Sequence, residues 1–390
     1  MTNTRLRPYQ QTVLAEIQKH NKGIIIIPTG GGKTLIFMED VKQRILSATK
    51  PLVFVIVAPK ILLSSQLYSE FNSFLKGVGD TYQSCVHSGE DGITDPSMIK
   101  VSHQLIQELE YHHLIFTTYK SLPRILEAGI DIDVAIFDEA HHSVMESNFV
   151  GVAQTSQAAK NSFFYTATPR HTDSKTTMAN STVYGGTIIS LPPKELVEGG
   201  YILPPRVKIK KFDVLQTNEL SSDVDCNNII ETIDETYTSK IIVCAKSSKQ
   251  IMDLIVETNF ITSLKERNFS YMYITSKTGA IIDGLKVSRD VFFETLNDWG
   301  KNPNKKFIVM HRSILSEGIS INGLETAIFL RNMNIIEMTQ NIGRVLRKDG
   351  ISKTFGLCVV PVYSNVGIAT EKSLQALIEN MFGEVATFDK

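Results

Sequence analysis

A glycine-rich loop with the composition of a phosphate-binding loop lies near the start of the sequence. Glycines 30–32 are followed by Lys33 and Thr34, and the apolar run Gly23–Ile27 precedes them, with Ile27 where the strict pattern has its first glycine. Glycines let backbone N–H groups point at phosphate oxygens in front of a helix N-terminus. Lys33 would then reach the β- and γ-phosphates of ATP, and the Thr34 hydroxyl would bind Mg²⁺. The predicted nucleotide-binding residues of this loop are Thr29, Gly30, Gly31, Gly32, Lys33 and Thr34.

Two adjacent carboxylates follow a short apolar run in the first half. Asp138 and Glu139 come directly after Val134–Phe137, and doubly wound folds place catalytic groups at the carboxyl ends of their parallel strands. Asp138 can hold Mg²⁺ through water, and Glu139 can polarise an attacking water. Two acids after a strand can also act as a helix N-cap. Together with the phosphate loop they favour hydrolysis of ATP.

One glutamine and two arginines in the second half could complete such a site. Gln340, Arg344 and Arg347 are spaced by four and three residues within a helical pattern over 335–348, which places them on one helix face. Guanidiniums directed at phosphate would stabilise the charge of the transition state. The alternative is a surface helix whose arginines form ion pairs.

The elements that must position these residues are short apolar runs alternating with helical patterns. This alternation predicts parallel sheets covered on both faces. A stretch rich in proline and glycine over 191–205 separates the halves. We therefore predict two doubly wound α/β domains, 1–198 and 199–390. The predicted strands are Gly23–Ile27, Leu52–Ala58, His113–Thr117, Val134–Phe137, Ser162–Thr166, Lys240–Ala245, Tyr271–Thr275, Phe307–His311, Ala327–Leu330 and Gly356–Val360.

Composition sets wider limits. The 390 residues suit two domains, and 42% apolar with 21% charged residues is ordinary for a globular protein. The net charge of −1 gives no global basic field, so any nucleic-acid surface must be a local strip. The basic run Arg206–Lys211 is the nearest candidate for such a strip, but a solvated edge strand is the interpretation that we prefer. The four cysteines match no metal-ligand spacing, and Cys244 and Cys358 suit a core. No apolar run could cross a membrane and no signal-peptide pattern is present, so we expect a soluble protein of the cytoplasm or nucleus.

With these residues in view, the chain resembles superfamily 2 helicases of the DEAD/DEAH type over nearly its whole length. The resemblance rests on six motifs in the family order, including the run Asp-Glu-Ala-His at 138–141 and the Gln-x-x-Gly-Arg-x-x-Arg pattern at 340–347. It implies that Gln10 hydrogen-bonds adenine and Arg7 stacks on it. It also implies that Thr166 and Thr168 link hydrolysis to movement. Residues 316–319 resemble the motif in which Glu317 and Gly318 contact nucleotide.

The resemblance also suggests where nucleic acid would bind. Pro59 and Lys60 after the second strand, and Thr118 with Tyr119 after a later one, stand where relatives contact phosphates, and Thr275 and Ser276 stand there in the second domain. Threonine hydroxyls suit contacts that position a strand without reading its sequence. Each pair can equally be a simple strand cap. Ser320 replaces the usual aspartate of its motif, so the ribose contact of that aspartate does not carry over.

The resemblance implies a minimal core of two tandem RecA-like domains that hydrolyse ATP with Mg²⁺ where the two domains meet. The branch with phage, viral and restriction-type helicases is most similar, which favours DNA over RNA. We expect a monomer, with a protein partner as a possible source of specificity. An alternative is an ATPase that remodels or grips DNA or a protein without separating strands. A small-molecule kinase gives no reason for a second domain with two spaced arginines.

Overall fold

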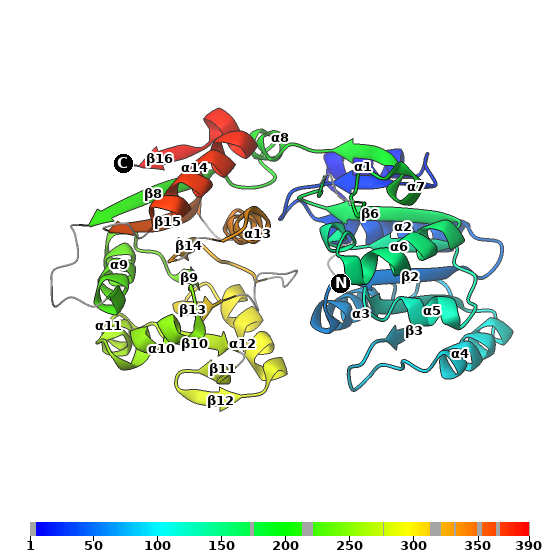
Figure 1. Cartoon of the computed structure of the whole chain (residues 1–390), viewed down its shortest axis with the longest axis horizontal. Coiled ribbons are helices and arrows are strands. Elements are labelled where there is room, and N and C mark those ends of the chain that lie inside the picture. The colour runs from blue at the N-terminus through cyan, green and yellow to red at the C-terminus, as the bar shows by residue number, and fades with distance from the viewer. Residues whose placement is uncertain are drawn as a thin grey trace. The chain divides into compact units, whose positions relative to one another are not determined.

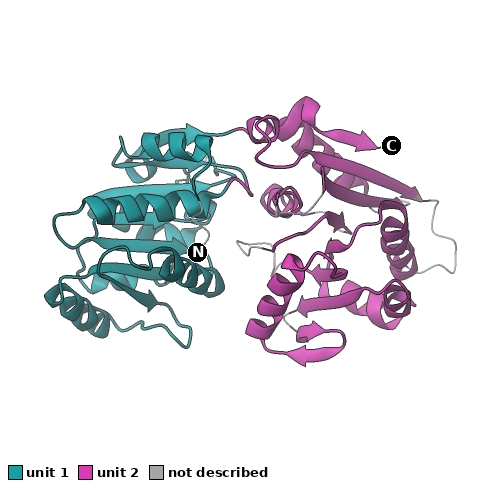
Figure 2. Cartoon of the chain, turned by 180° about the vertical axis from the view of Figure 1, so that it is seen from behind, with its two compact units in different colours: residues 1–28, 32–191 teal, residues 29–31, 192–390 magenta. Residues whose placement is uncertain are grey.

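The computed structural model of the chain describes residues 5–171, 175–212, 221–275, 277–312, 321–330, 333–348, 353–363 and 367–389. It divides into two compact units (Figures 1 and 2), residues 1–28 with 32–191 and residues 29–31 with 192–390. Helix α8 (Pro193–Glu198) belongs to the second unit, although the boundary expected after residue 198 would place it in the first. The limits of the domains stay a prediction.

A parallel sheet forms the centre of the first unit. Its strand order in the described residues is β3-β4-β2-β5-β6-β1-β7. Its strands are β1 (Lys22–Ile26), β2 (Val53–Ala58), β3 (Thr81–Val86), β4 (His112–Thr118), β5 (Val134–Phe137), β6 (Asn161–Thr166) and β7 (Gly186–Ser190). Its helices are α1 (Pro8–Ile17), α2 (Lys33–Ser47), α3 (Ile61–Phe74), α4 (Pro96–Glu108), α5 (Pro123–Glu127), η1 (Ala140–His142), α6 (Glu146–Ala158) and α7 (Ser181–Tyr184).

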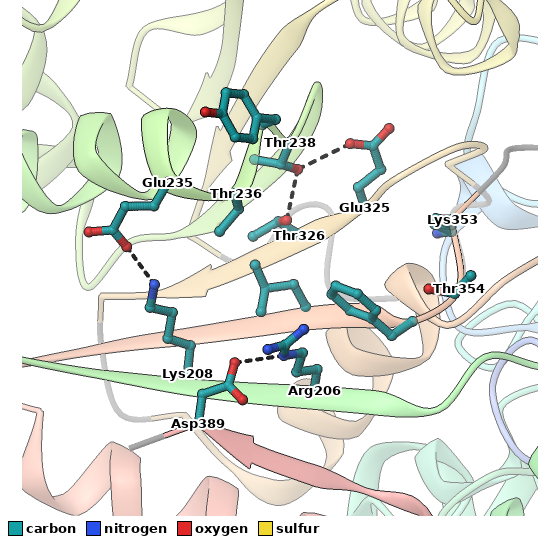
Figure 3. A pocket seen from close by; sticks show the side chains of 13 residues that line it. Arg206, Lys208, Glu235, Thr236, Thr238, Glu325, Thr326, Lys353, Thr354 and Asp389 are labelled. Carbon is teal, nitrogen blue, oxygen red and sulfur yellow. Dashed lines mark hydrogen bonds and ion pairs between the residues drawn. The ribbon is translucent and has the colours of Figure 1, made fainter.

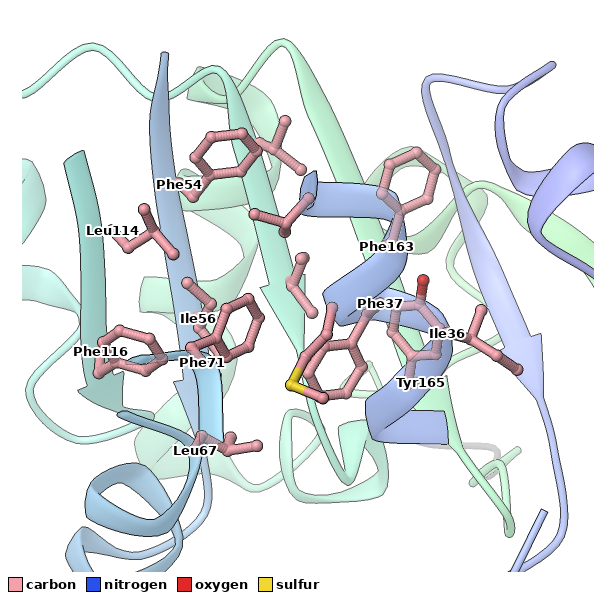
Figure 4. Packing of buried hydrophobic residues seen from close by; sticks show 14 of the residues in the cluster. Ile36, Phe37, Phe54, Ile56, Leu67, Phe71, Leu114, Phe116, Phe163 and Tyr165 are labelled. Atoms are coloured by element: carbon pink, nitrogen blue, oxygen red, sulfur yellow. The ribbon is translucent and has the colours of Figure 1, made fainter. Parts of the chain in front are cut away.

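The central strands of this sheet are apolar on both faces because helices cover both. In β2, Phe54 and Ile56 pack toward α1, α2 and α3, while Val55 and Val57 pack toward α4, α5, α6 and α7. Figure 4 shows the first cluster, with side chains of α2 and α3 meeting those of β2, β4 and β6. Consecutive side chains of a strand point to opposite faces, so a continuous apolar run is what this position requires.

The second unit is built around a longer, mixed sheet. Its order in the described residues is β12-β11-β10-β13-β9-β14-β15-β8-β16, parallel except for the hairpin that pairs β11 with β10 and β12. Its strands are β8 (Pro205–Phe212), β9 (Lys240–Cys244), β10 (Ser270–Thr275), β11 (Gly279–Ile282), β12 (Leu285–Val287), β13 (Phe307–His311), β14 (Thr326–Phe329), β15 (Gly356–Tyr363) and β16 (Thr387–Asp389). Its other helices are α9 (Ser221–Thr236), α10 (Ser248–Val256), α11 (Phe260–Glu266), α12 (Arg289–Lys301), α13 (Ile335–Val345), α14 (Ile368–Phe382) and η2 (Gly383–Val385).

The second unit has a core of its own. Helices α9, α10 and α11 pack on one face of the sheet through residues such as Ile229, Leu254 and Phe260. Cys244 and Cys358 are buried free thiols, as expected for small core residues. No described helix is both long and apolar enough to cross a membrane.

The predicted α/β architecture is confirmed, and each predicted strand overlaps an observed one. The edge-strand interpretation of Arg206–Lys211 is wrong. These residues form β8, which lies between β15 and β16, because β16 closes the edge that the sequence pattern leaves open. Lys210 is buried there and pairs with Glu231 and Glu235, each at 3.2 Å. The positive charge of Lys210 is therefore balanced by two glutamates and not by solvent.

Because each unit has its own buried clusters, we predict that a fragment of residues 1–198 folds alone. It should unfold in a single cooperative thermal transition with a far-UV spectrum typical of α/β proteins. Circular dichroism of the fragment, compared with the full chain, measures this. A gradual transition with no midpoint would show that the first unit depends on the second.

Candidate functional site

The predicted site residues of the first unit gather at one edge of its sheet. β5 pairs in register with β2 and β6, so Phe137 lies level with Val57 and Phe164, and Ile26 of β1 lies level with Thr166. The carboxyl ends of these strands lead into the phosphate loop, the Asp138–Glu139 turn and the Thr166–Thr168 segment. Parallel pairing therefore brings together groups that are far apart in the sequence.

The phosphate loop has the backbone that its glycines permit. Gly32 precedes α2 with a φ of +75°, in the left-handed region. A Cβ at this position would come within 2.4 Å of Gln10 Nε2, so a larger residue would also have to displace the Gln10 side chain. The Thr29 hydroxyl is buried and has no hydrogen-bond partner among the described residues. An incoming phosphate would give it one.

Gln10 is already engaged inside the protein. Its Nε2 donates to the carbonyl of Gly32 at 3.5 Å, and its Oε1 accepts the backbone N–H of Arg7 at 2.9 Å. Arg7 itself stands at the N-cap of α1. Gln10 thus joins the start of α1 to the phosphate loop, and its contact with adenine stays a prediction.

Lys33 and the two acids form a buried charge cluster. Lys33 and Glu139 are 8% and 7% exposed, and Lys33 Nζ lies 3.7 Å from Glu139 Oε1. Burial, followed by the charge of Glu139, raises the pKa of Asp138 to about 7, and Lys33 opposes this shift. A cation beside Asp138 would remove the cost of ionising it. The Asp138 carboxylate suits Mg²⁺, which prefers carboxylate and water ligands, and the Thr34 hydroxyl stays a predicted ligand.

The Asp138–Glu139 turn holds an unusual backbone conformation. Glu139 has a φ of +46°, which non-glycine residues rarely adopt outside constrained sites. Its N–H donates to Asp138 Oδ1 at 2.9 Å, so the first carboxylate anchors the start of the turn. The strained conformation directs the Glu139 carboxylate toward Lys33.

His141 connects this turn to the predicted coupling segment. Its Nδ1 lies 3.2 Å from the Thr166 hydroxyl and 3.5 Å from Glu139 Oε2. Thr166 Oγ1 in turn accepts the N–H of Thr168 at 3.1 Å. Burial lowers the pKa of His141 to about 3, so the ring is neutral at neutral pH. The Asp-Glu-Ala-His motif contains His141 but does not indicate this role, because only the fold brings Thr166 beside it.

In the second unit, Gln340 and Arg344 are buried on α13, at 3% and 2% exposure. Arg344 Nη1 donates to Asn341 Oδ1 at 3.1 Å, whereas neither amide atom of Gln340 has a hydrogen-bond partner within the described ranges. A buried unsatisfied amide costs about 1–3 kcal/mol, which points to a ligand that would satisfy it.

The predicted helix over 335–348 is wrong at its end. α13 stops at Val345 with Leu346 as its C-cap, so Arg347 lies beyond the helix and helical spacing does not place it on the face of Gln340. The amphipathic pattern continues past the last helical residue, which is why the sequence overestimates the length. Glu317 and Gly318, with Ser320, lie outside the described residues.

The predicted nucleic-acid contacts are largely engaged in local structure. The Thr118 hydroxyl bonds Ser121 Oγ at 3.2 Å, and Thr275 Oγ1 accepts the N–H groups of Lys277 and Thr278 at 3.3 and 3.0 Å. These two threonines therefore cap strands, the alternative that the sequence left open. Pro59 is half-buried and Lys60 is exposed before α3. Ser276 lies outside the described residues.

The prediction that the Tyr119 side chain contacts nucleic acid is wrong. It is 2% exposed, and its hydroxyl donates to the backbone carbonyl of Asp138 at 2.8 Å. The side chain is therefore not presented to a ligand but supports the Asp138–Glu139 turn. The Thr-Thr-Tyr pattern does not reveal this, because the contact crosses an intervening strand.

A pocket of about 400 Å³ in the second unit lies away from these residues (Figure 3). It opens at the amino ends of β8, β14 and β15, whereas α13 follows the carboxyl end of β14. Its charges are paired internally, Lys208 with Glu235 at 2.5 Å and Arg206 with Asp389 at 2.6 Å. Glu325, which also lines the pocket, accepts the Thr238 hydroxyl and the Ser239 N–H, so it too is engaged within the unit.

Cys85, His87 and Asp91 approach one another within 4.8 Å, a grouping that cysteine spacing does not predict. The Gly89 N–H donates to His87 Nδ1 at 3.2 Å, which leaves the ring proton on Nε2. Burial, with a smaller effect of Asp91, raises the pKa of the Cys85 thiol to about 11. Burial thus disfavours the thiolate that a metal would bind, so we assign no metal here.

Comparisons with known proteins agree with this geometry. Residues 3–171 match the family model described as "Type III restriction enzyme, res subunit". The chain is 31% identical to the DNA 3'-5' translocase XPB2 of Sulfurisphaera tokodaii over 215 residues, 55% of this chain and 41% of that protein. Its structure is similar to the ATP-dependent Type ISP restriction-modification enzyme LlaBIII bound to DNA (TM-score 0.77, 18% identity, 99% of this chain and 31% of that chain). It is also similar to Mss116p bound to ssRNA and AMP-PNP (TM-score 0.65, 15% identity, 99% and 74%).

These similarities confirm the resemblance to superfamily 2 helicases and the two-domain RecA-like fold. The chain spans less than half the length of the translocase and about a third of the restriction-modification enzyme.

The raised pKa of Asp138 predicts a pH-dependent cost in stability. From pH about 4 to about 7 the folded protein keeps a proton that the unfolded chain releases, so parent stability falls as pH rises through this window. Asp138→Asn cannot ionise and should unfold at a higher temperature than the parent at pH 8, with the difference shrinking toward pH 4. Thermal unfolding at several pH values measures it. An equal difference at every pH would contradict the shift.

Proposed function

We propose that this chain, whose first unit carries a domain of the superfamily 2 helicases, is an ATP-driven motor that moves along or remodels nucleic acid. The observation that carries the proposal is the buried cluster of Lys33, Asp138 and Glu139 beside a glycine-bounded phosphate loop. Burying one lysine against two acids is costly unless a ligand uses them. ATP with Mg²⁺ has the phosphates and the cation that such a cluster accommodates.

Each residue of the first unit has a task in hydrolysis. Lys33 leaves Glu139 to neutralise the β- and γ-phosphates, and the freed Glu139 carboxylate polarises the attacking water. Thr34 and Asp138 would hold Mg²⁺, which supplies charge neutralisation at the phosphates. Neutral His141, between Glu139 and Thr166, keeps the carboxylate oriented without adding charge. Movement of Thr166 and Thr168 would follow loss of the γ-phosphate.

The second unit would add two arginines to the charge that Lys33 supplies. We propose that Arg344 and Arg347 stabilise the transition-state charge and that Gln340 helps to orient the water. Support comes from the buried, unsatisfied amide of Gln340. The first unit alone should therefore bind ATP but not turn it over.

A row of basic residues suits the backbone of nucleic acid. In the second sheet Lys246 follows β9, Arg312 follows β13, Lys277 follows β10 and Arg289 follows β12, and all four are exposed. The strand registers place His311 level with Cys244 and Ile274, so these residues share one edge. At ~4.8 Å per strand, β12 to β9 spans roughly 19 Å, enough for about five phosphates of one strand at ~3.4 Å each.

DNA is the proposed partner. Among the proteins reported above, the translocase is named for DNA and the restriction-modification enzyme is bound to DNA, whereas Mss116p is bound to ssRNA. The short contact row and the capped threonines also suit an ATPase that grips or remodels DNA without separating strands. Displacement of a short labelled strand distinguishes the two, because the gripping ATPase would hydrolyse ATP without releasing it.

We predict that Arg347→Ala keeps nucleotide binding but lowers kcat by about 10³-fold, the range for a missing arginine at transferring phosphate. Lys33→Ala should instead lose turnover together with affinity, because its ammonium binds the phosphates directly. Steady-state ATPase and binding of a fluorescent ATP analogue measure both. Near-parental turnover in either variant would contradict the assignment of that residue to the ATP site.

We also predict that single-stranded DNA stimulates the ATPase and that stimulation fades with salt. Each phosphate contact contributes a slope of about −0.7 in a log–log plot of affinity against salt. Lys277→Gln with Arg312→Gln should flatten the slope, whereas Lys306→Gln, at the opposite end of β13 from Arg312, should not. Fluorescence anisotropy with a labelled oligothymidine measures it. An ATPase unchanged by DNA or RNA at low salt would reject the nucleic-acid motor.

A further inference from the structure

The hydroxyl of Tyr119 is bound to the backbone of the catalytic turn. The residue is enclosed in the core of the first unit and donates to the Asp138 carbonyl at 2.8 Å. Its ring stacks on Phe137 with centroids 6.3 Å apart and an interplanar angle of 28°. A buried tyrosine hydroxyl requires a partner, and here the partner is a carbonyl that no strand pairing uses.

That carbonyl belongs to the peptide that sets the direction of Glu139. The same peptide plane carries the Glu139 N–H, which donates to Asp138 Oδ1 at 2.9 Å. Tyr119 fixes the oxygen side of the plane, and Asp138 fixes the nitrogen side. Directly after it, Glu139 has its φ of +46°. A strained conformation of this kind persists only where its surroundings hold it.

The contact reaches across one strand of the sheet. Tyr119 follows β4 and Asp138 follows β5, and β2 lies between them. The Tyr119 N–H donates to the Ala58 carbonyl at 3.2 Å, and the Asp138 N–H donates to the Val57 carbonyl at 2.9 Å. Both segments are thus anchored to the end of β2. Thr118, a predicted nucleic-acid contact, is the residue before Tyr119.

We propose that Tyr119 is a positioning residue for ATP hydrolysis. Its hydroxyl holds the Asp138–Glu139 peptide so that Glu139 faces Lys33 and Asp138 faces the place for Mg²⁺. Without the hydroxyl, the buried carbonyl loses its donor and the peptide can rotate to relieve the strain at Glu139. The inference rests on the proposed ATPase for its catalytic consequence, but the holding of the turn can be observed without any activity.

Tyr184 provides a matched control on the same turn. It is also buried, and its hydroxyl lies 2.8 Å from Ser143 Oγ, which donates to the Ala140 carbonyl at 2.5 Å. Tyr184 therefore supports the later part of the turn without touching the Asp138–Glu139 peptide. Tyr119→Phe and Tyr184→Phe each remove one buried hydroxyl and keep the ring.

The experiment compares these two variants in the full chain. Hydrogen exchange of the segment 138–143, followed by mass spectrometry, should be about tenfold faster in Tyr119→Phe than in the parent, the factor for one lost hydrogen bond. Exchange in Tyr184→Phe should stay within about twofold of the parent over the same segment. ATPase assays should show kcat about tenfold lower in Tyr119→Phe, with KM for ATP changed less than about twofold.

Parental exchange in Tyr119→Phe would overturn the inference, whatever the ATPase shows. Equally faster hydrogen exchange in both variants would also overturn the inference, because it would show that loss of either buried hydroxyl destabilises the core as a whole. If the parent shows no ATPase, the proposed function fails, while the exchange experiment still decides whether Tyr119 holds the turn. Faster exchange in Tyr119→Phe with a parental kcat would reject the catalytic role.

Discussion

The burial of Lys33 against Asp138 and Glu139 is the interaction on which the rest of the first unit depends. Charges leave water at a large cost, which must be offset by close pairing and hydrogen bonds. The sheet provides the conditions, because strands β1, β5 and β6 run parallel and deliver their following residues to one edge. Large apolar clusters on both faces hold that edge rigid. The fold thus holds together Lys33, Asp138 and Glu139, which would separate if they were free in solution.

Around this cluster, several polar groups make two contacts each. Thr166 contacts the ring of His141 and accepts the N–H of Thr168, and Glu139 lies near both Lys33 and His141. Such shared contacts make the arrangement cooperative, since displacing one member disturbs two others. If the contacts of Glu139 change, His141 and then Thr166, at the end of β6, would therefore shift as well.

The sequence predicts those parts of the molecule that local pattern controls. The buried strands, such as β2 and β5, are continuous apolar runs, and the phosphate loop is recognisable from its glycines. β3 was missed because its residues are mixed in polarity and mostly half-buried, and β16 because three residues form no pattern. The end of α13 and the role of Tyr119 depend on contacts from other strands and loops. Such contacts leave no periodic signal in the chain.

The bond between Gln10 and the phosphate loop has a consequence for base selection. The Nε2 of Gln10 donates to the Gly32 carbonyl, and its Oε1 accepts the Arg7 N–H. Both ends of the amide are therefore hydrogen-bonded within the protein before any nucleotide binds. A base that binds to Gln10 as predicted would have to replace both bonds, and adenine could, because it presents a donor amino group beside an acceptor nitrogen. Guanine presents two acceptors on the same edge and would leave the glutamine oxygen unmatched. Discrimination among nucleoside triphosphates would then arise from competition with the protein's own backbone.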